Sequence, residues 1–254
     1  IAGVAIATVL AQAGAFLTAV LYLNKNHKII RFSFTKLVFD KEIFKKSIRI
    51  GLPTGIQQTF VSIGLTALIG IVNTFGTNVI AAYSVVMRIG SLVTLPSMNF
   101  SAALSTFVGQ NIGAKKESRV KSGFISTLKM SSLVSITVTI FVMLGSEFLM
   151  NLFTNDRAVI EIGKEYLMIV AGFYVVFSAM FTISGVMRGA GDTLIPMFFT
   201  LISLWGVRLP AAWFLSRELG ENGIWWSMPI GWGVGLILSY IYYLSGNWKK
   251  KSVI

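Results

Sequence analysis

The spacing of charged residues constrains this chain more than any other feature. No Asp, Glu, Lys or Arg occurs in residues 1–24, 50–87, 89–114, 166–187 or 222–248. A helix of about 20 apolar residues is long enough to cross a bilayer. Soluble domains carry about 25% charged residues, whereas 13% are charged here and 54% are hydrophobic. The sequence therefore predicts an all-α, polytopic membrane protein, because a soluble bundle of such apolar helices would need a polar shell that is missing.

Turn residues divide the chain into seven apolar segments. The expected spans are residues 1–23, 50–73, 79–108, 120–145, 166–187, 194–215 and 223–244. Between the fourth and fifth spans, residues 146–165 are expected to form a loop. The stretch "LVFDKEIFKKSIRI" (37–50) fits either a helix lying on the membrane surface or the cytosolic end of the next span.

Lys and Arg are enriched in cytoplasmic loops, and their distribution orients the spans. Residues 24–49, 109–129, 188–192 and 247–251 would share one side, and they hold 17 of the 22 basic residues. The opposite side holds three. The stretch 107–123 is thus expected to be a cytoplasmic hairpin turned at Gly109 and Gly113, and the C-terminus is expected in the cytoplasm. The net charge of +12 reflects topology, so a nucleic-acid partner is not expected.

Six stretches of the sequence resemble one family, in its order and at its spacing. They are "GLPTGIQQ" (51–58), "AAYSVVMRIGSLVTLP" (81–96), "FVGQNIGAKKESRVKSG" (107–123), "LFTNDRAVIEIGKEYLMI" (152–169), "GVMRGAGDTLIPM" (185–197) and "LGENGIWWSMPIGW" (219–232). The chain resembles the C-terminal half of a MATE (multidrug and toxic compound extrusion) transporter, a family with twelve helices in two six-helix lobes.

This resemblance implies a domain map. Residues 1–23 would be the last helix of an N-terminal lobe, 24–49 a basic cytoplasmic linker, 50–246 a six-helix C-terminal lobe and 247–254 a cytoplasmic tail. The remainder of the N-terminal lobe is expected on the same polypeptide. The implied protein lies in the cytoplasmic membrane, in contact with lipid.

The resemblance also implies secondary active efflux of drug-like, cationic or amphiphilic organic compounds by alternating access, coupled to H+ or Na+ antiport. A flippase for lipid-linked oligosaccharides is one alternative, but only Arg88 and Arg208 would supply its cationic cavity. A non-transporting membrane scaffold or remnant is another. No nucleotide-binding, hydrolase or metal-ligand motif occurs, so neither an enzyme nor a cofactor or metal is expected.

Polar groups within the spans are the candidates for function, because lipid cannot satisfy them. No Asp or Glu lies deep in a predicted span, and Asp192 is expected at a turn. The coupling carboxylate therefore stays unassigned, with the other lobe as its expected place. The cavity candidates are Gln57, Gln58, Tyr83, Met87, Arg88, Asn99, Phe177 and Met180.

Each cavity candidate has a structural alternative. The amides could form hydrogen bonds between helices, and the aromatic and Met side chains could be plain packing. Arg88 could face the cavity or extend to the membrane interface. Arg208 is expected to be a structural anchor near the outer face. Pro96 removes a backbone hydrogen bond within a long span, so it is the candidate hinge, with a static kink as the alternative.

Overall fold

The computed structural model describes residues 2–26 and 39–251, and it divides into two compact units. Unit 1 covers residues 1–45 and contains α1 (Ala2–Asn26), none of whose side chains is buried. Residues 27–38, which hold His27 and the central part of the predicted linker, lie outside the described residues, as do 252–254 of the predicted tail.

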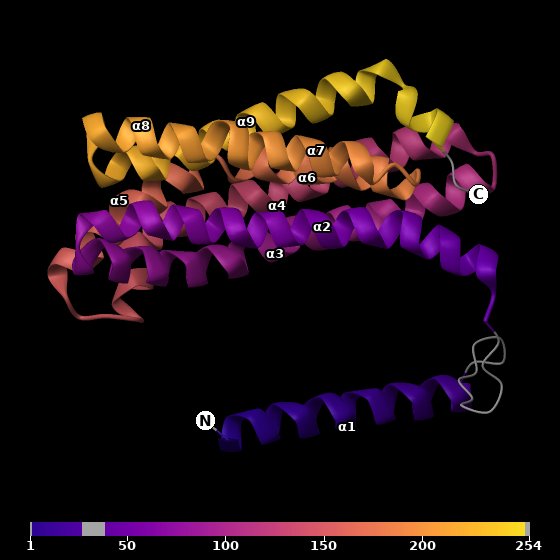
Figure 1. Cartoon of the computed structure of the whole chain (residues 1–254), viewed down its shortest axis with the longest axis horizontal. Coiled ribbons are helices and arrows are strands. Elements are labelled where there is room, and N and C mark those ends of the chain that lie inside the picture. The colour runs from indigo at the N-terminus through magenta and orange to yellow at the C-terminus, as the bar shows by residue number, and fades with distance from the viewer. Residues whose placement is uncertain (1, 27–38, 252–254) are drawn as a thin grey trace. The chain divides into compact units, whose positions relative to one another are not determined.

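Unit 2 covers residues 46–254 and is a bundle of long helices that run side by side (Figure 1). Its elements are α2 (Lys41–Val72, begun in unit 1), η2 (Asn73–Phe75), α3 (Thr77–Gly113), α4 (Glu117–Asn151), α5 (Arg157–Ala171), α6 (Tyr174–Gly189), α7 (Leu194–Leu201), η3 (Ile202–Arg208), α8 (Leu209–Leu219), α9 (Glu221–Ser245) and η4 (Asn247–Lys251).

The predicted membrane spans are present in the described part of the chain. Six helical segments are long and apolar enough to cross a membrane. The predicted fifth span, residues 166–187, is divided between α5 and α6, which are bent by 50° and pass the same test when the pair is taken as one span. The stretch from α7 through η3 to α8 is one such segment, with a π-helical turn at its centre. The prediction of a polytopic all-α membrane protein is therefore confirmed.

The predicted loop at residues 146–165 is wrong. Helix α4 continues to Asn151, and α5 begins at Arg157. Asp156 caps α5 by accepting a hydrogen bond from the backbone N–H of Ala158 at 2.9 Å. Four of the charges that indicated a loop, Arg157, Glu161, Lys164 and Glu165, lie on an exposed face of α5. The other face buries Val159, Ile160, Gly163, Tyr166, Leu167 and Val170.

The stretch 37–50 is not a separate surface helix where the structure describes it. Asp40 accepts hydrogen bonds from the backbone N–H groups of Glu42 and Ile43, and α2 then runs without interruption to Val72. Phe44 and Ile48 thus belong to the first turns of the span helix. Leu37 and Val38 lie outside the described residues.

The 107–123 hairpin is present, but its glycines do not make the turn. Gly109 and Gly113 are both within α3, and the reversal occurs at residues 114–116, where Lys115 has a positive φ of 56°. A Cβ on Gly109 would lie 3.2 Å from the carbonyl oxygen of Gly189. Gly109 therefore serves a close approach between α3 and α6 rather than a turn.

Buried apolar side chains form two clusters within unit 2. The larger one joins α2, α3, α4, α5, α6, η3, α8 and α9 and contains Tyr83, Tyr166 and Trp225. The smaller one lies at the hairpin end and includes Phe124, Met187 and Trp248, which brings η4 back against α4 and α6. The candidate site lies on the contact between α3 and α6, where their backbones approach most closely.

Candidate functional site

A pocket of about 450 Å³ opens between α3 and α6. Its lining residues are Met98, Asn99, Ser101, Ala102, Ser105, Phe181 and Arg188. Small side chains on α3 face glycines on α6 here. A Cβ on Gly185 would lie 2.7 Å from the carbonyl oxygen of Ser101, and one on Gly189 would meet the backbone of Ser105. The pocket therefore lies beside a contact at which only glycine fits.

The polar side chains that line the pocket are two serine hydroxyls, one asparagine amide and one arginine guanidinium. Ser101 Oγ donates to the carbonyl oxygen of Phe181 at 2.6 Å. Arg188 is the charged lining residue, and Asn99 contributes an exposed amide. Because no carboxylate lines this pocket, it suits hydrogen-bond acceptors and apolar groups, and a cationic ligand would need an acidic partner from elsewhere.

Arg188 also connects the pocket to α2 and α7. Its Nη2 donates to Gln57 Oε1 at 3.5 Å, and Gln57 Nε2 donates to Thr200 Oγ1 at 2.6 Å. Thr200 in turn donates to the carbonyl oxygen of Pro196. Gln57 is buried, and the two hydrogen bonds of its amide join α2 to α6 and α7. The structure thus gives Gln57 the interhelical role that was the alternative to lining a cavity.

The predicted cavity residues do not form one group. Asn99 lines the pocket, while Gln58 and Arg88 are exposed. Tyr83 and Met87 belong to the large apolar cluster. Phe177 packs on Phe181 and Trp232 with ring centroids 4.4 and 4.9 Å apart. Met180 packs over Gly235, since a Cβ there would lie 2.5 Å from its sulfur.

Sequence reasoning missed Arg188, Ser101, Ser105 and Thr200. Arg188 had a visible signal, because it is the first charge after the uncharged run 166–187. Ser101 and Ser105 had no signal in the sequence, because they line the pocket only through the close contact of α3 with Gly185 and Gly189 of α6. Pro96 lies inside α3, just before Met98 of the pocket wall, and its role as a hinge stays a prediction.

Asp192 lies at the turn between α6 and α7, as expected, and it is buried. Tyr242 donates its hydroxyl hydrogen to Asp192 Oδ2 at 2.6 Å, and Asp192 Oδ1 accepts from the backbone N–H of Ile195 at 3.5 Å. The carboxylate therefore ties α9 to the start of α7, close in sequence to Arg188.

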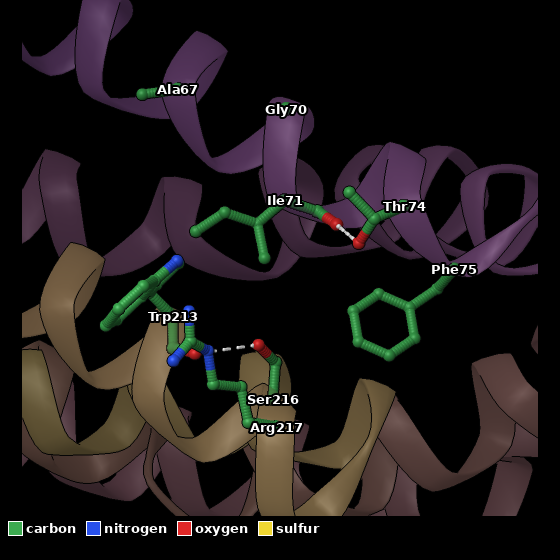
Figure 2. A pocket seen from close by; sticks show the side chains of 8 residues that line it. All are labelled: Ala67, Gly70, Ile71, Thr74, Phe75, Trp213, Ser216 and Arg217. Carbon is green, nitrogen blue, oxygen red and sulfur yellow. Dashed lines mark hydrogen bonds between the residues drawn. The ribbon is translucent and has the colours of Figure 1, made fainter.

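A second pocket, of about 350 Å³, lies between α2 and α8 at the opposite end of the lobe from the α3–α4 hairpin (Figures 1 and 2). It is lined by Ala67, Gly70, Ile71, Thr74, Phe75, Trp213, Ser216 and Arg217. The guanidinium carbon of Arg217 lies 3.6 Å from the centroid of the Trp213 ring, in a cation–π contact. An exposed Arg held on a Trp fits the interface between membrane and water.

The anchor role predicted for Arg208 is wrong. Arg208 exposes 9% of its surface and lies at the end of η3, inside the helix bundle rather than at its rim. Arg217, one helix further along, has the exposed position that was expected of an anchor. Local sequence could not separate the two, because both follow apolar runs.

No group of three or more His, Cys, Asp or Glu side chains that could hold a metal ion occurs within residues 2–26 and 39–251. What the fold presents is a membrane-spanning helical lobe with a pocket between two of its long helices. That architecture defines a polytopic helical membrane protein, and comparison with known proteins assigns its family.

The MatE family model matches residues 53–214, and the chain belongs to this family, the MATE transporters. The probable multidrug resistance protein YoeA of Bacillus subtilis is 33% identical over 99% of this chain and 55% of its own length. The probable multidrug resistance protein NorM of Thermotoga maritima is 31% identical over 99% and 54%. The chain thus spans about half the length of the curated relatives it matches.

A solved structure, an outward-facing multidrug resistance MATE family transporter of the MOP superfamily, superposes with a TM-score of 0.89. It is 22% identical, and the match covers 98% of this chain and 57% of that one. At this identity the likeness shows the fold. Together with the spans, these matches confirm the predicted family and the integral membrane location.

Proposed function

We propose that this chain is the C-terminal part of a secondary active exporter, which moves drug-like organic compounds out across the cytoplasmic membrane. The observation that carries the proposal is the family match over residues 53–214 in a chain whose relatives are named as multidrug resistance proteins. The mechanism is alternating access between two lobes, the second supplied by the same polypeptide. Transport of this kind makes and breaks no covalent bond in the substrate, so the protein is not an enzyme.

The proposed orientation places the α3–α4 hairpin and the tail in the cytoplasm. Lys249 of η4 forms an ion pair with Glu117 at the start of α4, with 3.4 Å between Nζ and Oε2. The two basic segments therefore lie at one end of the lobe. Positive charge gathered at one end supports a cytoplasmic location for it.

The positive charge in the pocket affects where a cationic substrate and the coupling ion can bind. Arg188 is its charged lining residue, and in a low-dielectric site a cation of the substrate would be repelled by it. We propose that a carboxylate of the other lobe binds the cationic or amphiphilic substrate, and binds H+ or Na+ when the substrate has left. The amide of Asn99 and the rings near Phe181 would then hold the apolar body of the substrate.

A lipid-linked oligosaccharide flippase is the weaker proposal. It would need several cations around one central cavity to hold a pyrophosphate, and the pocket between α3 and α6 has one. The scaffold or remnant alternative predicts a folded lobe that supports no transport, so measurement of transport separates it from the exporter.

The test uses the full-length native polypeptide in proteoliposomes with ethidium as the probe. An imposed pH gradient or Na+ gradient should drive ethidium against the ethidium concentration gradient. The imposed gradient that does so identifies the coupling ion. Asn99→Ala should raise the KM for ethidium severalfold, while Arg217→Gln, at the other end of the lobe, should leave it unchanged. Movement that ignores both gradients would refute the antiport proposal.

A further inference from the structure

Arg208 is a buried cation without a compensating charge. It lies midway along the α7–η3–α8 span and exposes 9% of its surface. Within the part of the chain that the structure describes, its Nε has no hydrogen-bond partner, and no carboxylate forms an ion pair with it. An unpaired charge inside a membrane protein costs several kcal/mol, of the order of 3 on insertion scales.

The side chain of Arg208 is directed into the large apolar cluster. Leu204 and Ala212, about one turn before and after it on the same helix face, are both buried there. A Cβ on Gly231 of α9 would lie 3.1 Å from Arg208 Cβ and 3.7 Å from its Cδ. Arg208 therefore packs on α9 at a glycine, on the helix face that Leu204 and Ala212 bury in the apolar cluster of Tyr83 and Tyr166.

Two more buried polar groups in this cluster have no hydrogen-bond partner among the described residues. They are the hydroxyl of Tyr83 and Nε1 of Trp225. The rings of Tyr83, Tyr166 and Trp225 are nearly parallel, with centroids 4.1 Å apart for Tyr166 and Trp225 and 6.1 Å apart for the other two pairs. The Trp N–H and the Arg N–H can only donate, and a phenol donates readily. The cluster thus holds a positive charge and three buried donor groups that find no hydrogen-bond partner among the described residues.

Acidic side chains near this end of the lobe do not supply that acceptor. Glu165 is exposed on α5 and accepts from Asn222 Nδ2 at 3.2 Å. Glu218 and Glu221, at the α8–α9 junction, are not buried. A water molecule could accept the hydrogen bonds, but it would leave the positive charge uncompensated in a low dielectric.

We propose that the cluster binds a small inorganic anion, chloride under cellular conditions, against Arg208. The anion would accept hydrogen bonds from Arg208, Tyr83 and Trp225, which satisfies the three orphaned groups and cancels the buried charge. The close stacking of the rings favours an occupant of one atom over an organic anion. The site is separate from the pocket of Arg188 and does not depend on the proposed substrate.

The test measures thermal unfolding of the purified full-length transporter in sodium chloride and in sodium gluconate at equal ionic strength. Chloride should raise the unfolding midpoint of the native protein saturably. Arg208→Gln should abolish the difference between the two salts. Arg217→Gln removes an exposed cation of the same span and should retain the difference, which controls for general salt effects.

A milder variant keeps the test decisive if Arg208→Gln does not fold. Tyr83→Phe removes one hydroxyl and keeps the ring, so it should raise the half-saturating chloride concentration about tenfold, as expected for one lost hydrogen bond to a charged partner. Bromide soaked into crystals of the native protein should give an anomalous peak beside Arg208. Equal midpoints in chloride and gluconate for the native protein, or an undiminished chloride response in Tyr83→Phe and Arg208→Gln, would overturn the proposal.

Discussion

Substitution of Gly185 by Ala tests the contact on which the candidate pocket rests. The added Cβ would lie 2.7 Å from the carbonyl oxygen of Ser101 and 2.8 Å from Ser101 Oγ. Ordinary carbon–oxygen contacts are longer by more than half an ångström, and a backbone oxygen inside a helix cannot rotate away. Ser101 Oγ is itself held by its hydrogen bond to Phe181. The substitution must therefore push α3 and α6 apart.

The magnitude follows from comparison with Gly90→Ala in α3. A Cβ on Gly90 would meet nothing within 4 Å, so this control gains helix propensity of about 1 kcal/mol without a clash. Gly185→Ala has the same propensity gain, which cancels in the comparison. The difference in the free energy of unfolding between the two variants is then the overpacking cost, about 1–3 kcal/mol in disfavour of Gly185→Ala.

The assay is thermal unfolding of both variants of the full-length protein in one detergent, followed by intrinsic fluorescence and by the fraction that stays monodisperse after heating. Gly185→Ala should unfold below the native protein, and Gly90→Ala at or above it. Equal midpoints for the two variants would refute the reasoning, because they would mean that α3 and α6 do not approach as closely as the glycine contact requires.

Three further predictions follow from individual contacts. Gln57→Ala should lower the free energy of unfolding by about 1–3 kcal/mol, because Thr200 and Arg188 lose a partner, whereas the same change at the adjacent, exposed Gln58 should be neutral in denaturation experiments. Tyr242→Phe should cost about 1–3 kcal/mol by leaving the buried carboxylate of Asp192 without its 2.6 Å donor, and a melt unchanged from the native protein would exclude that role. Trp248→Ala should cost about 3 kcal/mol and expose the hairpin end to protease, while Trp226→Ala, at a half-exposed site, should cost less than half as much.

Much of the fold followed from local patterns. Uncharged runs indicated the spans, because hydrocarbon excludes charge over any stretch that crosses it. The exception at residues 146–165 shows the limit of that argument. Charges at Glu161, Lys164 and Glu165 break the run, yet they share one face of α5 and leave the other face apolar. The position of a charge along the chain does not by itself show on which face of a helix the residue lies.

The candidate site was less predictable than the fold. Two adjacent glutamines look alike in sequence, but Gln57 is buried between helices and Gln58 is exposed. Two arginines within spans look alike as well, and Arg88 is exposed while Arg208 is buried. In each pair, the outcome depends on which neighbouring helix packs against that face, and that helix comes from a distant part of the chain.

The membrane class, the approximate spans, the family and the charge asymmetry between the two ends were all predictable from the sequence, because each depends on composition along a local stretch. Helix packing was needed to show that Ser101 and Ser105 face Gly185 and Gly189 and that Arg188 lines the pocket. It also showed that Arg208 is buried without an acidic partner among the described residues. These relations join residues that are far apart in the chain. They arise from helix packing, which fixes the rotation of each helix about its own axis.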